Sequence, residues 1–274
     1  MKFSWSILLL LAACRGTATP AVSAVHVPAD SEIPSGPLGA SIRRGLALLT
    51  ATHDSLPTYV GNGLRCVSCH LDEGRRSPQS WVGVTGRYPQ YRSRSGTVET
   101  IEYRINGCFL RSLNGKAIPV DGNDMRDIVS YLTFLSTGQR VGYKAPPPDT
   151  RWSGLRPDTA AGNKFFATNC ARCHGGDGAG AMAAPPVWGP RSYNIGAGMS
   201  RARTAASFIV ANMPFDKAIT LTDQQALDVA AYINSQPRPD FAGKANDWPN
   251  GDAPPDVAYQ TKAAHPAPPG SRAH

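Results

Sequence analysis

Long hydrophobic runs are almost absent from this sequence. The one apolar run, residues 7–13, is shorter than the about 20 apolar residues that a membrane-spanning helix needs, so we predict no membrane span. Because the run follows Lys2 at the start of the chain, it is typical of a secretory signal, which we place in residues 1–24. Leu11–Cys14 resembles a bacterial lipobox, with cleavage after residue 13 and a lipid on Cys14; cleavage near residue 24 is the alternative. We therefore expect a periplasmic protein whose only membrane contact would be a lipid anchor at Cys14.

Blocks of positive charge are also missing, although the chain carries a net charge of +8. The lysines and arginines are scattered, and no stretch matches a nucleic-acid-binding motif. We therefore exclude nucleic acid as a partner. The positive charge instead favours anionic partners or substrates.

Cysteines available for disulfides are few. An exported protein with six cysteines would normally form three disulfides, but four of the six stand here in two Cys-x-x-Cys-His motifs. In this motif both thiols bind the vinyl groups of a c-type haem, and the histidine is the proximal iron ligand. The residues predicted to hold two covalently attached haem c groups are Cys66, Cys69, His70, Cys170, Cys173 and His174. With Cys14 in the lipobox, only Cys108 belongs to no motif.

The two haem motifs stand in two similar halves of the chain. Each motif is followed by a glycine-rich polar loop and later by an amphipathic helix, predicted at residues 124–136 and 222–235. Thr222 or Asp223 is the natural N-cap of the second helix. An internal repeat of this kind is typical of an all-α protein with two class I cytochrome c-like domains in tandem. The covalent haem fills a core that so small a domain could not build from side chains alone.

The domain boundaries follow from the changes in composition. In chain order we predict a tether to residue 36, an N-terminal cytochrome c domain at 37–145, a linker at 146–157, a C-terminal cytochrome c domain at 158–240 and a proline-rich tail at 241–274. The N-terminal domain opens with a helix predicted over residues 37–52. We expect the tail to lie over the surface or to fray, with Trp248 holding part of it.

The second iron ligand of each haem is expected between its motif and the following helix. In the second half this window contains Met182, Met199 and Met213. Met182 follows His174 too closely to reach the opposite haem face. Met213 is favoured because Pro214 follows it directly before the last helix, and Met199 is the reserve candidate.

No methionine lies in the corresponding window of the first half, where Met125 belongs to the helix core. The residue in the window is Cys108, and nearby cations favour the thiolate form that binds iron. The cations are Arg92, Arg94, Arg104, Arg111 and Lys116. We predict Cys108 as the second ligand of the first haem, with a buried inert cysteine as the alternative. A thiolate lowers the potential of a haem and a thioether raises it, so electrons should pass from the first haem to the second.

Three stretches of the chain then carry a family resemblance. YPQYRSRSGTVETIEYRINGCFLRSLNGKAIP, ASFIVANMPF and LTDQQALDVAAYINSQPRP are similar to the dihaem thiosulfate dehydrogenases that form tetrathionate, and the likeness covers residues 38–258. The resemblance implies His70 and Cys108 on one iron and His174 and Met213 on the other. It also implies a substrate pocket lined by Arg94, Arg104, Ser112 and Lys116. We expect Arg92 and Arg111 to be peripheral. Some members exchange a lysine for the distal methionine; Asn212 occupies that position here, so no exchange is expected.

The activity implied is the oxidation of two thiosulfate ions to tetrathionate. Two dianions must approach each other, at a cost of roughly 4 kcal/mol per unit-charge pair at close range, and arginines offset this repulsion. The Cys108 sulfur would leave the iron and carry a thiosulfate-derived sulfur as a covalent adduct. The electrons would pass to a small periplasmic cytochrome c or a high-potential iron–sulfur protein. The alternatives are tetrathionate reduction, which is the reverse reaction, and a dihaem electron carrier without a substrate.

Overall fold

The structure is a computed structural model that describes residues 26–142, 150–181, 184–216 and 221–263. The predicted signal region with Cys14, and Met182, lie outside these residues. Within the described ranges, no helix combines the length and apolar character needed to cross a membrane.

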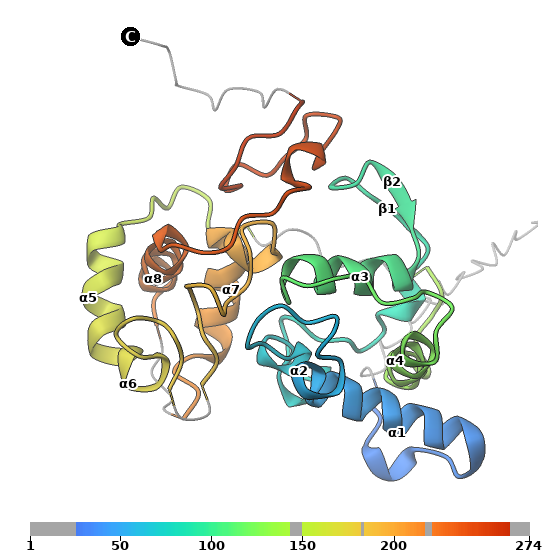
Figure 1. Cartoon of the computed structure of the whole chain (residues 1–274). Helices are drawn as coiled ribbons and strands as arrows, with labels where there is room; N and C mark the ends of the chain where they lie inside the picture. The colour runs from blue at the N-terminus through green and yellow to red at the C-terminus, as the bar shows by residue number, and fades with distance from the viewer. Residues whose placement is uncertain (1–25, 143–149, 182–183, 217–220, 264–274) are drawn as a thin grey trace, which may run out of the picture.

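Helices dominate both halves of the chain, which confirms the all-α prediction. The first half contains α1 (Gly36–Thr50), α2 (Thr52–Ser55), β1 (Gln90–Arg92), β2 (Thr97–Glu99), α3 (Ile101–Arg111) and α4 (Asn123–Phe134). The second half contains α5 (Thr159–Asn169), α6 (Ala171–His174), α7 (Ala202–Asn212) and α8 (Asp223–Ser235). Short 3-10 helices span Asp30–Glu32, Cys66–Ser68, Asp72–Gly74, Thr85–Arg87, Gly198–Ser200 and Lys244–Asn246. Figure 1 shows the helices of the second half on the left and those of the first half on the right.

The predicted helices form close to their expected bounds. Helix α8 begins at Asp223, and the Thr222 side chain accepts a hydrogen bond from the Gln225 amide, which identifies Thr222 as the N-cap. An antiparallel hairpin of β1 and β2, with Tyr91 opposite Val98, was not expected. Its strands are three residues long, too short for a period-two pattern to stand out in the sequence.

The internal repeat extends to the way the helices cross. In the first half α1 packs on α4 where Gly45 meets Asp127, and a Cβ atom on Gly45 would lie 2.0 Å from the Asp127 carbonyl oxygen. In the second half α5 packs on α8 in the same way, and a Cβ on Gly162 would lie 2.1 Å from the Asp228 carbonyl oxygen. Both crossings therefore need glycine, because any side chain would separate the helices.

The loops after the two haem motifs repeat as well. Gly74 and Gly178 both have a positive φ, and each lies directly against a tryptophan, Trp81 in the first loop and Trp188 in the second. Each tryptophan then meets a tyrosine of the final helix edge to face, with ring centroids 6.3 Å apart for Trp81 and Tyr131. The pair Trp188 and Tyr232 repeats this contact at 5.8 Å. The two halves therefore repeat the same packing of glycine, tryptophan and tyrosine beside their haem motifs.

Substitution Gly45→Ala is expected to lower the free energy of unfolding by about 3 kcal/mol or more, since the new methyl group overlaps backbone atoms of α4. Gly198→Ala is the matched control, because no atom lies within 4 Å of its Cβ position and its φ is not positive. We expect the control to stay within about 0.5 kcal/mol of the parent protein. Chemical unfolding followed by far-ultraviolet circular dichroism measures both, and equal stability of the two variants would contradict the packing argument.

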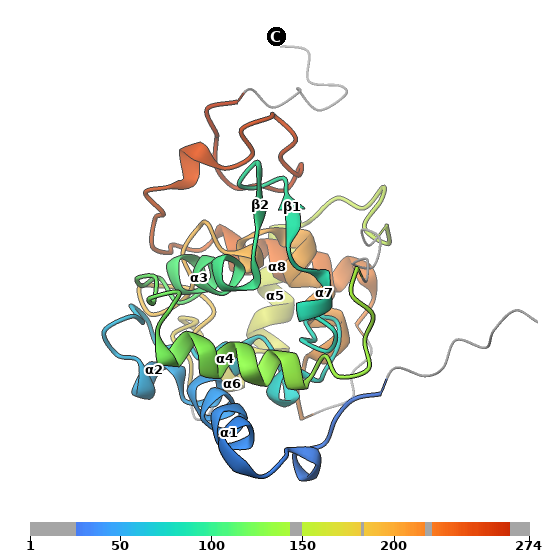
Figure 2. The same cartoon turned by 90° about the vertical axis from the view of Figure 1, so that its right-hand side faces the viewer.

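The segment after α8 returns to the first half of the chain. Figures 1 and 2 both show it beside the β1–β2 hairpin. The backbone N–H of Trp248 donates to the carbonyl oxygen of Arg94 at 2.7 Å, and the Asn250 side chain donates to the Tyr91 hydroxyl at 2.9 Å. Trp248 is buried, as expected for a residue that holds the tail.

Candidate active site around Cys108

His70 is prepared to bind a metal through one ring nitrogen. Its Nδ1 lies 2.6 Å from the carbonyl oxygen of Gln79, which can only accept, so Nδ1 carries the proton and Nε2 keeps its lone pair. The ring stacks on Trp81 with centroids 4.6 Å apart. Burial lowers the pKa of His70 to about 4, so the imidazole is neutral at physiological pH.

His174 has the same arrangement in the second half. Its Nδ1 donates to the carbonyl oxygen of Pro185 at 2.9 Å, which again leaves Nε2 free. Burial lowers the pKa of His174 below its ordinary value. Two neutral histidines with Nε2 available are the donors that a haem iron requires.

The cysteines of both motifs are free thiols. Burial raises the pKa of Cys66 and of Cys69 to about 12, and that of Cys170 to about 11. Paired free thiols directly before such a histidine fit a covalently attached haem c in each half.

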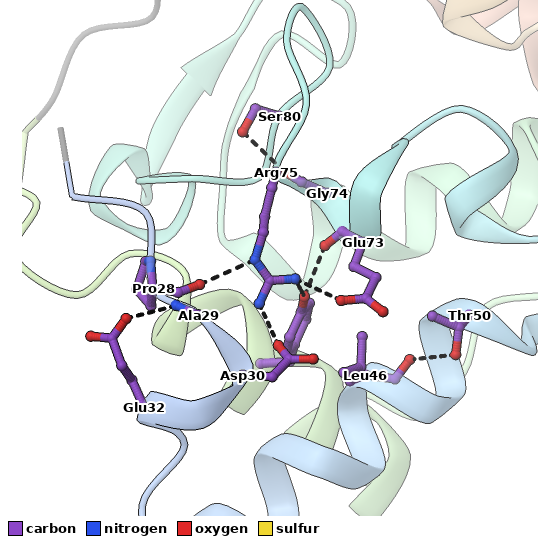
Figure 3. Close-up of polar contacts among 11 residues, drawn as sticks. Pro28, Ala29, Asp30, Glu32, Leu46, Thr50, Glu73, Gly74, Arg75 and Ser80 are labelled. Atoms are coloured by element: carbon purple, nitrogen blue, oxygen red, sulfur yellow. Dashed lines mark hydrogen bonds and ion pairs between the residues drawn. The ribbon is translucent and has the colours of Figure 1, made fainter. Parts of the chain in front are cut away.

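The loop that follows His70 is held by an arginine network, shown in Figure 3. Arg75 donates to the carbonyl oxygen of Pro28 at 3.1 Å, to the Glu73 carboxylate at 2.7 Å and to the Tyr131 hydroxyl at 3.1 Å. It also forms an ion pair with Asp30. The Arg75 side chain therefore joins the N-terminal segment, the loop after His70 and α4. These contacts fix the backbone that supports His70.

Arg104 and Cys108 on α3 and Ser112 at its C-cap form one row, because residues four apart lie on the same helix face. Nη1 of Arg104 donates to Sγ of Cys108 at 2.9 Å. The Cys108 sulfur in turn raises the pKa of Arg104, so the guanidinium stays charged. Phe109 and Ile101 are buried on other sides of the helix and anchor it in the core.

Cys108 lies near the first haem motif. Burial is the main cause of the raised pKa values of Cys66 and Cys69, and the charge of the Cys108 sulfur raises both further. Burial is also the main cause of the lowered pKa of His70, and the positive charge of Arg104 lowers it further. The sulfur and the guanidinium are therefore close enough to the Cys66–His70 motif to act on it.

The two candidate second ligands have different local settings. Cys108 lies inside α3, whereas Met213 is the residue at which α7 ends. Met213 and Met199 both pack against the core of the second half, and Met199 also contacts the core of the first. Met125 is buried in the first core, in agreement with the prediction that it is a core residue. Iron binding by Cys108 and Met213 stays a prediction.

The other predicted pocket residues are distributed over three places. Ser112 ends α3 and its carbonyl oxygen accepts from the Asn62 side chain at 2.8 Å. Lys116 is exposed beyond the helix. Arg94 lies in the turn between β1 and β2, where its Nη1 donates to the carbonyl oxygen of Gly196 at 2.7 Å. Burial lowers the pKa of Arg94 to about 10. This value is still well above 7, so the guanidinium is cationic at neutral pH.

A loop of the second half closes the C-terminal end of α3. The Asn194 N–H donates to the carbonyl oxygen of Arg111 at 3.2 Å, and its side chain donates to that of Leu110 at 2.9 Å. Asn62 bridges the halves by donating to the carbonyl oxygens of both Ser112 and Ser192. The carbonyls of Leu110 and Arg111 at the end of the site helix are thus satisfied by Asn194 from the other half of the chain.

Arg111 was predicted to be peripheral, but it makes several structural contacts. It binds the Asp247 carboxylate with two hydrogen bonds, at 2.8 and 2.7 Å, and its guanidinium lies over the Phe241 ring at 4.1 Å. Asp247 was not singled out from the sequence. The available signal was a single acid beside Trp248 in a proline-rich tail, which does not reveal a partner.

Comparison with known proteins agrees with these observations. A family model described as SoxA/TsdA, cytochrome c domain, matches residues 59–141, and the cytochrome c model matches residues 159–237. The chain is 43% identical to a thiosulfate dehydrogenase of Psychrobacter arcticus, over 85% of this chain and 74% of the relative. It is 41% identical to one from Allochromatium vinosum, over 83% of this chain and 89% of the relative.

A solved structure is also similar. Thiosulfate dehydrogenase (TsdBA) from Marichromatium purpuratum matches with a TM-score of 0.73 and 37% identity, covering 85% of this chain. The present chain spans about half of that longer chain, 54% of its length. Two cytochrome c domains, each with its attachment motif, indicate two covalently bound haem c groups.

Proposed function

The chain belongs to the thiosulfate dehydrogenase family, and we propose that it oxidises two thiosulfate ions to one tetrathionate. The observation that carries the proposal is the 2.9 Å contact between Nη1 of Arg104 and Sγ of Cys108, on a helix beside the first haem motif. An electron carrier needs no such charged thiol site.

Four side chains would complete the coordination of the two irons. His70 and Cys108 would hold the first haem iron, and His174 and Met213 the second. Asn212, next to Met213, uses its side-chain nitrogen to donate to the Phe208 carbonyl oxygen, so position 212 offers no amine to replace the methionine. We therefore propose that Met213 stays bound in both redox states. When bound, the two haem groups supply two one-electron acceptors, the first of lower potential than the second.

The sulfur chemistry balances around Cys108. Its thiolate and the outer sulfur of one thiosulfate form a sulfur–sulfur bond and release two electrons, which leaves a Cys–S–S–SO3⁻ adduct. The second thiosulfate attacks, through its own sulfane sulfur, the adduct sulfur that lies between Sγ of Cys108 and the sulfonate group, and the Cys108 thiolate leaves. The product is tetrathionate, and the thiol site is restored without any change in protons.

The neighbouring cations lower the electrostatic cost of this reaction. Two dianions at close range repel with four times the energy of a unit pair, roughly 16 kcal/mol at moderate dielectric. Arg104 lies at the reacting sulfur, and Arg94 offers a guanidinium that binds sulfonate oxygens in pairs. Ser112 continues the row on α3, and Lys116 would attract anions from solvent.

The acceptor and the location remain part of the proposal. We propose a small periplasmic cytochrome c or a high-potential iron–sulfur protein as the acceptor, reached from the second haem. The N-terminal region would export the chain and, with a lipid at Cys14, anchor it. The signal region and Cys14 lie outside the described residues.

Steady-state assays with ferricyanide or cytochrome c as acceptor test the activity. We expect thiosulfate-dependent reduction with two electrons and one tetrathionate for every two thiosulfates consumed. Tetrathionate reduction by a strong donor is measured on the same preparation. A much faster reverse reaction would favour a reductase, and haems that dithionite reduces but thiosulfate does not would favour an electron carrier.

A further inference from the structure

The C-terminal segment, defined here as residues 241–259, holds Arg94 at two points. The Trp248 N–H donates to the Arg94 carbonyl oxygen at 2.7 Å, and the Trp248 ring lies 4.5 Å from the Arg94 guanidinium carbon. Trp248 is 2% exposed and has a φ of +50°, a conformation that large side chains rarely adopt. Such a conformation persists only where the surroundings over-determine it, and it is frequent at functional sites.

The segment is itself anchored on both sides of Trp248. Asp247 receives both Nη groups of Arg111 and also the Tyr259 hydroxyl. Phe241 packs under the Arg111 guanidinium. The position of Trp248 relative to α3 is therefore fixed by a partly buried ion pair and a cation–π contact.

The charges of the two arginines are used differently. Arg111 is neutralised by Asp247. Within the described residues Arg94 forms no ion pair, and its one hydrogen-bond acceptor is the Gly196 carbonyl oxygen. A guanidinium has five N–H donors, so Arg94 keeps most of them for an anion. None of these remaining donors is sealed away from solvent in the described structure.

We propose that Trp248 is a positioning residue that orients the Arg94 guanidinium toward the sulfonate oxygens of thiosulfate. Trp248 does not touch the substrate. It covers one face of the guanidinium and fixes the hairpin turn, so that the donor edge of Arg94 points to the anion. The inference rests on the proposed function, because it assigns a role within the same site.

Replacing Trp248 by alanine is expected to raise the KM for thiosulfate about tenfold while kcat changes less than about threefold, as for a loss of uniform substrate binding. Trp248→Phe keeps an aromatic face and is expected to recover most of the loss, leaving KM about threefold raised. Lys244→Ala is the control in the same segment, since among the described residues its side chain pairs with Asp240 alone and its loss should leave both constants unchanged. Calorimetric titration with thiosulfate measures binding independently of turnover.

A double-mutant cycle with Arg94→Ala separates positioning from general stability. If Trp248 acts through Arg94, then neither Trp248→Ala nor Trp248→Phe raises KM further in the Arg94→Ala background. An equal rise in both backgrounds, or an unchanged KM in the single variants, would overturn the inference. Because Trp248→Ala could fail to fold, the cycle is also run with Trp248→Phe. A parent protein that does not oxidise thiosulfate would refute the proposed function itself, so the two failures are distinguishable.

Discussion

Replacement of Cys108 by alanine is expected to reduce thiosulfate oxidation by about 10⁴-fold or more, because the variant loses the sulfur that we propose forms the covalent adduct. Arg104 and Arg94 would still bind the anion, so thiosulfate binding should weaken far less than turnover. The measurement is kcat with a chemical acceptor, together with a calorimetric titration of thiosulfate. The haem attached at Cys170 and Cys173 should remain reducible, since Cys108 lies in the other half of the chain.

The control for this variant is Tyr103→Ala, on the same helix but with a side chain that is 66% exposed. It should keep the turnover of the parent protein. Electron paramagnetic resonance of the oxidised protein adds a spectroscopic check: a low-spin thiolate-ligated haem signal is expected in the parent and in Tyr103→Ala and should be lost in Cys108→Ala. Full activity in Cys108→Ala would exclude covalent catalysis by this thiol.

Local signals explain which parts of the fold could be predicted. The haem motifs, the N-cap at Thr222 and the amphipathic pattern of α4 and α8 each lie within a few consecutive residues, where side-chain type and spacing determine the structure. The row of Arg104, Cys108 and Ser112 also follows from helical spacing once α3 is identified. The hydrogen bond between Arg104 and Cys108 is the consequence of that spacing.

Long-range contacts explain what could not be predicted. Asp247 and Arg111 are 136 residues apart, and the tail that carries Asp247 has no periodic pattern to reveal its position. From the sequence, Arg94 is known only to be 14 residues before Cys108. The structure shows that it lies in a hairpin turn, in contact with Gly196 and Trp248. The proposed substrate pocket, with Arg94 held by residues of both halves, therefore needs the tertiary structure, even when each half is recognisable alone.

Arg104→Gln is expected to lower kcat/KM for thiosulfate by about 10³-fold, the scale of losing one charge-stabilising donor at a reacting atom. The amide keeps much of the side-chain length but removes the charge beside Sγ of Cys108. Arg104→Lys keeps a charge without the planar fork and should fall between Arg104→Gln and the parent. Arg92→Gln is the matched control, since it removes an arginine from β1 whose guanidinium has no hydrogen bond or ion pair with the described residues.

The split between kinetic constants then shows how Arg104 acts. If its guanidinium stabilises the Cys108 thiolate and the anion beside it, the loss falls on both kcat and KM, because sulfur activation and substrate binding weaken together. A merely structural role would instead lower the unfolding temperature of Arg104→Gln and leave kcat of the folded fraction unchanged. Activities of Arg104→Gln and Arg92→Gln within a factor of about two of each other would contradict the role of this contact, since only Arg104 touches the sulfur.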